Sequence, residues 1–186
     1  MDLGLTDRVY VLTGASRGLG YATAQSLVAD GARVVLSARH PDTVDAAAAG
    51  LAGPDRAVGI TADLADPATP DRLVTAAHEH FGRLDGALIS VGGPPPGSAA
   101  SVDDEQWRHA FETVFLGSVR MARTVAAALP DGGAIALVLS TSARGPVAGL
   151  GISNGLRPGL AGVAKTSLTS TVRAECGWSA SCRVGS

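Results

Sequence analysis

The stretch TGASRGLG, at residues 13–20, carries three glycines between a β-rich run and a run with helical spacing. Gly14 allows a tight turn, Gly18 lets the backbone approach a pyrophosphate, and Gly20 permits close packing between the helix and the strand. A helix that begins here presents backbone N–H groups and a partial positive charge to an anion. The stretch predicts a phosphate-binding turn for a dinucleotide, and the alternative is a glycine turn that holds no ligand.

The elements around this turn alternate between strand and helix patterns. Short apolar runs predict buried strands at 8–14, 32–39, 56–64, 84–90 and 134–140. Helical spacing predicts helices at 18–31, 41–53 and 67–82, a long helix capped by Ser101 that runs through 107–129, and another that starts near Ser153. This order predicts an α/β fold, a Rossmann-like doubly wound parallel sheet with right-handed crossovers.

The composition excludes several classes of protein. The chain has 186 residues, of which 46% are hydrophobic and 17% charged, and this argues against disorder. A net charge of −2 gives no reason to expect nucleic acid or an anionic membrane as a partner. No apolar segment reaches the roughly 18 residues that span a bilayer, and the N-terminus does not resemble a signal peptide. We therefore expect a cytoplasmic protein.

The histidines do not follow the spacing of metal ligands, so no metal site is expected. Two of them lie two residues apart on a helix and point to different faces. We expect all four to be surface residues: His40, His78, His80 and His109.

The spacing TGxxxGxG resembles that of the short-chain dehydrogenase/reductase family, and the resemblance runs from about Thr6 to Lys165. The phrases GGPPPG (92–97), STSARGPVAGLGISNGLR (140–157) and GLAGVAKT (159–166) resemble a divergent branch described as 3-oxoacyl-carrier-protein reductase-like. The resemblance implies an NAD(P)(H)-dependent oxidoreductase that passes hydride to or from a carbonyl or alcohol carbon. It also implies a small-molecule substrate and a homo-oligomer.

The resemblance also implies a set of cofactor-binding residues. Family members use an acid near the adenine ring, which Asp63 matches, with the alternative that Asp63 forms a turn at a strand end. NAD-selective members place an acid at the end of the second strand, where this chain has Ser37, followed by Arg39. Arg17 lies in the glycine-rich turn, and the two guanidiniums can hold a 2′-phosphate, so NADP is the expected cofactor. The alternative is that both arginines are simply solvated. The candidates are Gly14, Ser16, Arg17, Gly18, Leu19, Gly20, Arg39, Asp63, Leu64 and Gly92.

The expected catalytic residues depart from the family pattern. The family uses a serine, a tyrosine, a lysine four residues after the tyrosine, and an asparagine. Here these positions hold Ser140, Ser153, Arg157 and Val114. Arg157 can hydrogen-bond ribose, but its pKa is too high for proton exchange, so water or a substrate group would complete the proton relay. The alternatives are that Ser153 caps a helix and that Arg157 is a surface residue.

Together with Ser142 and Asn154, the two candidate serines could orient a carbonyl group by hydrogen bonds. None of these side chains is an acid near neutral pH.

The sequence divides at Thr166 into an NADP-binding Rossmann domain (1–166) and an atypical tail (167–186). The family resemblance stops there. Codons can be chosen for the tail so that restoring one deleted base after the Thr166 codon gives a different amino-acid sequence. That second sequence resembles the family's next helix and strand. We therefore predict an out-of-frame tail that lacks the last strands of the family fold. The fifth strand would then be an unprotected sheet edge.

Two rivals to an active oxidoreductase stay open. The first is a non-catalytic dinucleotide-binding protein, and the second is an inactive truncated remnant of such an enzyme. Cofactor binding without turnover would favour the first rival, and the absence of both would favour the second.

Overall fold

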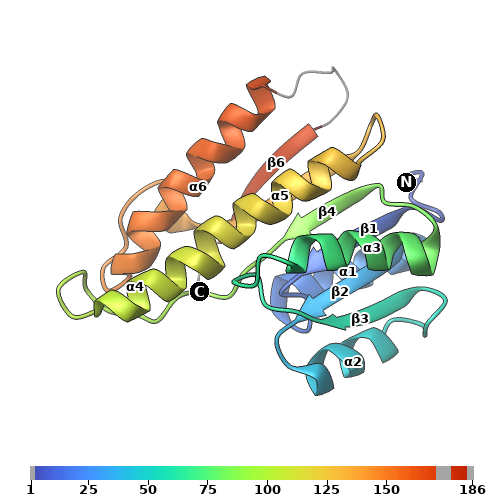
Figure 1. Ribbon diagram of the computed structural model, residues 1–186, viewed down its shortest axis with the longest axis horizontal. Helices are drawn as coiled ribbons and strands as arrows, with labels where there is room; N and C mark the ends of the chain where they lie inside the picture. The colour runs from blue at the N-terminus through green and yellow to red at the C-terminus, as the bar shows by residue number, and fades with distance from the viewer. Residues whose placement is uncertain (1–2, 171–176, 184–186) are drawn as a thin grey trace.

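A parallel sheet with the strand order β3-β2-β1-β4-β5-β6 forms the middle of the molecule (Figure 1). The computed structural model describes residues 3–170 and 177–183, with side chains over 3–166. The strands are β1 (Val9–Thr13), β2 (Arg33–Ala38), β3 (Ala57–Thr61), β4 (Gly86–Ile89), β5 (Ala134–Ser140) and β6 (Gly177–Arg183). The expected doubly wound α/β fold is confirmed.

Helices connect successive strands, as the sequence pattern predicts. They are α1 (Gly18–Ala29), α2 (Pro41–Ala49), α3 (Thr69–Phe81), α4 (Asp104–Ala110), the π-helix η1 (Phe111–Leu116), α5 (Gly117–Ala128), the 3-10 turn η2 (Thr141–Ala143) and α6 (Gly151–Ser170). None of the helices in the described part of the chain is long and apolar enough to cross a membrane.

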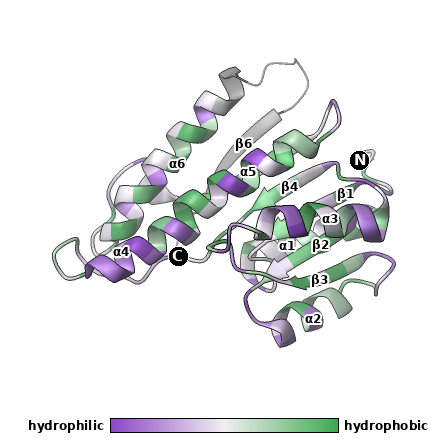
Figure 2. Ribbon diagram, viewed as in Figure 1, coloured by the Kyte–Doolittle hydropathy of each residue, from purple (hydrophilic) through white to green (hydrophobic). Residues whose placement is uncertain are grey.

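Alternate residues of β1 point to opposite faces of the sheet and into two separate cores. Val9 and Val11 join a cluster with side chains of α3, α5 and α6, whereas Leu12 joins a cluster with α1 and α2. In Figure 2 the strands β3 and β4 are coloured green to white, whereas α4 is mostly purple. Both faces of the central strands are therefore buried, as expected for a parallel sheet between helical layers.

The predicted start of the long helix is wrong by two residues. The N-cap is Asp103, whose carboxylate accepts a hydrogen bond from the Gln106 N–H at 2.8 Å, and the Gln106 side chain accepts one from the Asp103 N–H at 3.1 Å. This reciprocal capping box satisfies two backbone N–H donors at the start of the helix, so the helix is capped by Asp103 and not by Ser101. Ser101 instead lies in the preceding turn, where its hydroxyl donates to the Ser98 carbonyl at 3.1 Å.

The expectation that β5 would be an unpaired edge is also wrong. β6 pairs with β5 in parallel, in a register that runs from Ala134 opposite Gly177 to Ser140 opposite Arg183. An extended backbone can satisfy the edge N–H and C=O groups whatever its side chains are, so a break in family resemblance does not prevent pairing. The prediction of an out-of-frame tail concerns side chains that lie outside the described residues.

The carboxyl ends of β1 and β4 lie side by side, where the strand order changes direction. The Thr13 hydroxyl donates to the Ser90 carbonyl at 2.8 Å and accepts from the Ser90 N–H at 2.9 Å, and both residues are buried. In open α/β sheets, ligands bind outside the carboxyl ends of the strands at such a switch point.

Candidate functional site

The glycine-rich turn leaves no room for side chains at two of its glycines. Gly14 has a φ of +58°, and a Cβ there would lie 2.6 Å from the Ser90 carbonyl oxygen. At Gly20, a Cβ would lie 2.8 Å from the Gly14 oxygen and 2.9 Å from the Ala15 Cα. Glycine at these positions therefore sets how closely α1 packs against the end of β1.

Gly18 differs, because the space beside it is open. Its φ is +61°, and a Cβ would meet no atom within 4 Å. The first turn of α1 contains no acidic residue, and the N-cap residue, Arg17, makes no side-chain capping bond. The N–H groups at this helix start can therefore receive a phosphate, so the turn fits the pyrophosphate of a dinucleotide. Ser16 is half-buried and Leu19 is exposed.

The two arginines expected at a 2′-phosphate are both exposed. Arg39 follows β2 directly, and Arg17 precedes α1, so each lies at the carboxyl-end side of the sheet. Over the described residues, neither guanidinium enters a hydrogen bond or an ion pair. Ser37, in the place of an acid, is 97% buried at the end of β2 and adds no negative charge.

Asp63 lies beyond the end of β3, where it forms a turn. Its Oδ1 accepts the Ala65 N–H at 3.0 Å, and its backbone carbonyl accepts the Thr69 hydroxyl at 2.6 Å. Asp63 therefore forms a turn, as the alternative predicts, and its contact with the adenine ring stays a prediction. The Leu64 side chain is buried in the core, so any contact of Leu64 with a cofactor would come from its backbone.

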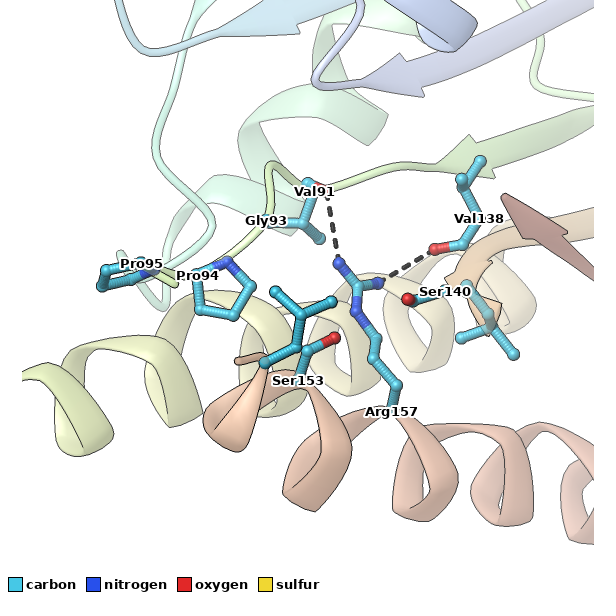
Figure 3. A pocket seen from close by; sticks show the side chains of 10 residues that line it. Val91, Gly93, Pro94, Pro95, Val138, Ser140, Ser153 and Arg157 are labelled. Atoms are coloured by element: carbon cyan, nitrogen blue, oxygen red, sulfur yellow. Dashed lines mark hydrogen bonds between the residues drawn. The ribbon is translucent and has the colours of Figure 1, made fainter. Parts of the chain in front are cut away.

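A pocket of about 120 Å³ opens between the ends of β4 and β5 and the start of α6 (Figure 3). All three expected catalytic residues, Ser140, Ser153 and Arg157, line it. The other lining residues are mainly apolar: Val91, Gly93, Pro94, Pro95, Val138, Leu139 and Leu150. Gly92 is exposed beside this segment and is not among the residues that line the pocket.

Arg157 reaches from α6 across the pocket to the ends of two strands. Its guanidinium donates from Nη1 to the Val138 carbonyl at 3.0 Å and from Nη2 to the Val91 carbonyl at 3.4 Å (Figure 3). Arg157 is 4% exposed, so the alternative of a surface residue is wrong. Its backbone partners explain the burial, because charge-assisted hydrogen bonds offset the cost of removing a guanidinium from water.

The serines form a hydrogen-bonded chain beside this guanidinium. The hydroxyls of Ser142 and Ser153 lie 2.9 Å apart, and Ser140 Oγ accepts the Ser142 N–H at 3.2 Å. The Ser140 and Ser153 hydroxyls both point toward the Arg157 side of the pocket (Figure 3). The Ser140 O–H donates to no acceptor in the described part of the chain, so it is available to a ligand oxygen.

Ser153 does not cap α6, which corrects one alternative. The helix begins at Gly151, and the Asn154 N–H already donates to the Leu150 carbonyl at 2.8 Å. Ser153 is therefore inside the first turn and 5% exposed. Its hydroxyl contacts Ser142 rather than the backbone donors of a helix end.

A buried carboxylate, that of Asp85, lies at the amino ends of the central strands, on the opposite side of the sheet from the pocket. Asp85 precedes β4 and accepts hydrogen bonds from Arg83, from Arg8 and from the Val9 N–H, at distances between 2.6 and 2.9 Å. Burial raises the pKa of Asp85, but these donors outweigh burial and hold the pKa below its ordinary value. The arrangement joins the beginnings of β1 and β4 and lies away from the pocket.

The histidines are surface residues in the structure. All four histidines are exposed, as expected. Among residues that the structure describes, no group of three or more His, Cys, Asp or Glu side chains could hold a metal ion.

The fold and the glycine-rich turn define a Rossmann-like α/β protein, and the comparisons identify its family. A family model described as short chain dehydrogenase matches residues 8–153, so the chain belongs to the short-chain dehydrogenase/reductase family. It is 33% identical over 165 residues to human "Dehydrogenase/reductase SDR family member 2, mitochondrial", covering 87% of this chain and 59% of that protein. It is 31% identical over 175 residues to levodione reductase of Leifsonia aquatica, covering 90% of this chain and 64% of that protein.

Solved structures show the same fold. A short-chain dehydrogenase/reductase from Brucella melitensis superposes with a TM-score of 0.89 at 24% identity, covering 97% of this chain and 74% of that one. L-Sorbose reductase from Gluconobacter frateurii, solved with NADPH and L-sorbose, superposes with a TM-score of 0.85 at 30% identity, covering 95% and 68%. The chain spans about three fifths of the length of the two curated relatives above.

Sequence reasoning missed the groups that hold the site together. The bonds between Thr13 and Ser90 join residues 77 positions apart. The bonds from Arg157 join it to the carbonyls of Val91 and Val138, which are 66 and 19 positions away. The carbonyl acceptors carry no sequence signal, because every residue has one. A polar residue inside an apolar strand end, such as Thr13, is a signal that could have been noticed.

Proposed function

We propose that this chain binds NADP(H) at the 13–20 turn and transfers hydride between the nicotinamide and a carbonyl or alcohol carbon in the 120 Å³ pocket. The observation that carries the proposal is the convergence of Ser140, Ser153 and Arg157 on a pocket at the carboxyl ends of β4 and β5. This edge of the sheet also carries the glycine-rich turn, as dinucleotide-dependent chemistry requires. Membership of an oxidoreductase family supports the reaction type.

The cofactor would be held by the glycine-rich turn and by the exposed arginines. Backbone N–H groups at the start of α1 would receive the pyrophosphate. Arg17 and Arg39 are free of competing ion pairs in the described residues and would bind the 2′-phosphate, which favours NADP over NAD. A relative that is 30% identical was solved with NADPH, which is consistent with this choice.

The residues of the pocket would bind and orient the substrate oxygen. The bound cofactor supplies the hydride. The Ser140 O–H is free to donate to a carbonyl oxygen, and the chain from Ser142 to Ser153 holds a second hydroxyl beside it. Arg157 adds positive charge that stabilises a developing alkoxide. Serine and arginine do not exchange protons readily near neutral pH, so water provides the proton.

A second candidate function is dinucleotide binding without catalysis. It is favoured by Arg157, which stands at the place of the family's lysine and donates to two backbone carbonyls. In this alternative the guanidinium joins β4 and β5 and does no chemistry.

Deuteride transfer separates the two functions. The protein is incubated with NADPH deuterated at C4 and a panel of small ketones, and the products are analysed by mass spectrometry. An alcohol one mass unit heavier than that from unlabelled NADPH supports hydride transfer. NADPH binding with no labelled product over the whole panel supports the binding protein instead.

A further inference from the structure

We infer that Asn154 is a positioning residue that fixes the wall of the pocket through two loops. Its carboxamide holds the 144–150 loop, which in turn holds the proline-rich segment at 92–97. The inference rests on the proposed function only in treating the pocket as the substrate site. The name "Asn154 clamp" is used below for Asn154, Val147, Gly149, Gly151 and Gly97.

The Asn154 carboxamide uses both of its polar groups on one residue. Its Oδ1 accepts the Val147 N–H at 2.9 Å, and its Nδ2 donates to the Val147 carbonyl at 2.9 Å. Both of these bonds go to Val147. The geometry therefore gives Asn154 a role toward the loop, and its role toward a substrate carbonyl stays a prediction.

The loop that Asn154 holds is bonded to the proline-rich segment. The Leu150 N–H donates to the Val147 carbonyl at 3.2 Å and closes a turn. The Gly97 N–H then donates to the Gly149 carbonyl at 2.7 Å, and the Gly151 N–H donates to the Gly97 carbonyl at 2.8 Å. Gly97 and Leu150 thus form a parallel bridge between segments that are far apart in the sequence.

Gly97 is the point at which the proline-rich segment can be held by its own backbone donor. Residues 94–96 are all proline and carry no backbone N–H, so the next donor along the chain is that of Gly97. The proline rings also fix φ, which makes the segment a stiff wall. Holding Gly97 therefore positions Pro94 and Pro95, both of which line the pocket.

The two loops meet backbone to backbone. A Cβ at Gly151 would lie 2.6 Å from the Ala99 nitrogen and 2.9 Å from the Ser98 carbonyl carbon. Neither neighbour is the end of a flexible side chain, so any residue other than glycine would separate the loops. This close contact gives a second way to disturb the clamp.

Neighbouring residues of α6 thus set two sides of the pocket: its polar floor, formed by Ser153 and Arg157, and its wall, formed by Leu150, Pro94 and Pro95. Ser153 and Arg157 supply polar groups to the floor, while Asn154 holds the loops that carry Leu150, Pro94 and Pro95. This arrangement predicts that Asn154 controls the width of the pocket and the size of the substrate, and that it leaves the glycine-rich turn unaffected.

Hydrogen–deuterium exchange of the clamp tests the inference directly. In Asn154→Ala, the amides of Val147, Gly97 and Gly151 should exchange about tenfold faster than in the parent, because a lost hydrogen bond has this effect. Amides of β1 and β2 should keep their parent rates. If Asn154→Ala does not fold, Asn154→Asp takes its place. It loses the donor to the Val147 carbonyl but keeps the acceptor for the Val147 N–H, so faster exchange is then expected at Gly97 and Gly151 and not at Val147.

Two matched controls separate the clamp from general damage. Gln106→Glu makes the same amide-to-acid change as Asn154→Asp, but the Gln106 side chain is used as an acceptor in its capping box, so the clamp amides should not respond. Gly151→Ala should accelerate exchange at Gly97, whereas Gly145→Ala should not, because a Cβ at Gly145 meets no atom within 4 Å.

The preference for bulky over small substrates is a measurement that would not change if Asn154 had a merely structural role. With NADPH, Asn154→Ala should raise the ratio of kcat/KM for a bulky ketone over a small one by about tenfold, at an NADPH affinity within about twofold of the parent. The inference would be overturned if the amides of Val147, Gly97 and Gly151 kept their parent exchange rates in Asn154→Ala. It would also be overturned if exchange became faster by the same factor throughout the protein. A parent that fails to bind NADPH contradicts the proposed function, and the exchange result then decides the clamp alone.

Discussion

The glycine-rich turn at 13–20 and the β5–α6 region at 140–157 lie at the same edge of one sheet, yet their polar groups are used differently. At the turn, Gly18 faces open space, and the guanidiniums of Arg17 and of Arg39, which follows β2, enter no hydrogen bond or ion pair in the described chain. In the β5–α6 region, Arg157, Ser153 and Asn154 all hydrogen-bond to the protein itself. The first region keeps groups available for a ligand, whereas the second uses them largely for its own structure.

This difference suggests that the two regions can change independently. A dinucleotide site depends on backbone geometry, which the glycines set. A reaction centre depends on side chains with suitable pKa values, and the residues proposed for it here are two serines and an arginine. The predictions below alter one region at a time, beginning with the largest expected effect.

Gly14→Ala should abolish NADPH binding. The new methyl group would lie 2.6 Å from the Ser90 carbonyl at a positive φ, so the turn must move away from β4. Overpacking of this kind costs about 1–3 kcal/mol in the free energy of unfolding. Fluorescence titration and urea unfolding measure the two effects.

Gly162→Ala is the matched control for this substitution. Its Cβ would meet no atom within 4 Å, and alanine favours a helix, so α6 should be stabilised by up to about 1 kcal/mol. NADPH affinity equal to the parent in Gly14→Ala would show that the turn does not bind the cofactor.

Arg157→Ala should destabilise the fold by about 2–4 kcal/mol, because the carbonyls of Val138, in β5, and of Val91, just after β4, lose charged donors. Urea unfolding measures the loss. Arg123→Ala, at an exposed helix position, should stay within about 0.5 kcal/mol of the parent. If the two variants were equally stable, Arg157 would not join the strands as described.

Asp85→Asn should cost about 1–3 kcal/mol at neutral pH and leave NADPH affinity unchanged, because Asp85 lies at the opposite edge of the sheet. The folded pKa of Asp85 is depressed, so its stabilising effect is present above the unfolded pKa of about 3.9 and is lost as pH falls below it. The difference in unfolding free energy between parent and variant should therefore shrink below about pH 4. A difference that stays constant down to pH 2 would contradict the assignment.

Ser140→Ala should have the smallest effect on the fold and on cofactor affinity. It removes one neutral hydrogen bond, from the Ser142 N–H, at a cost of about 0.5–1.5 kcal/mol. Its kcat with any ketone that the parent reduces should fall by more than its NADPH affinity changes. A variant with parent kcat would remove Ser140 from the reaction.

The sequence predicted the elements better than the connections among them. β5 was predicted with its observed bounds, because a continuous apolar run between turn residues leaves little ambiguity. The cap at Ser101 was wrong, since serine and aspartate are both good caps and the partner at Gln106 decides between them. β6 was missed because edge pairing uses backbone groups, which every sequence offers.

The site could be predicted in part. The register that aligned Ser140, Ser153 and Arg157 with the family pattern named three residues that line one pocket. Their partners could not be predicted, because the acceptors of Arg157 are main-chain carbonyls and those of Asn154 are the peptide groups of Val147. Such contacts follow from the tertiary fold and have no residue type of their own.

Titration of the parent with NADPH and with NADH, followed by nicotinamide fluorescence, tests the central claim most directly. The exposed Arg17 and Arg39 should make NADPH bind at least about tenfold more tightly than NADH, because a 2′-phosphate gains charge-assisted hydrogen bonds. Arg39→Asp should reverse or abolish the preference without changing the unfolding free energy. Equal affinities of the parent for the two cofactors, or no binding of either, would contradict the account.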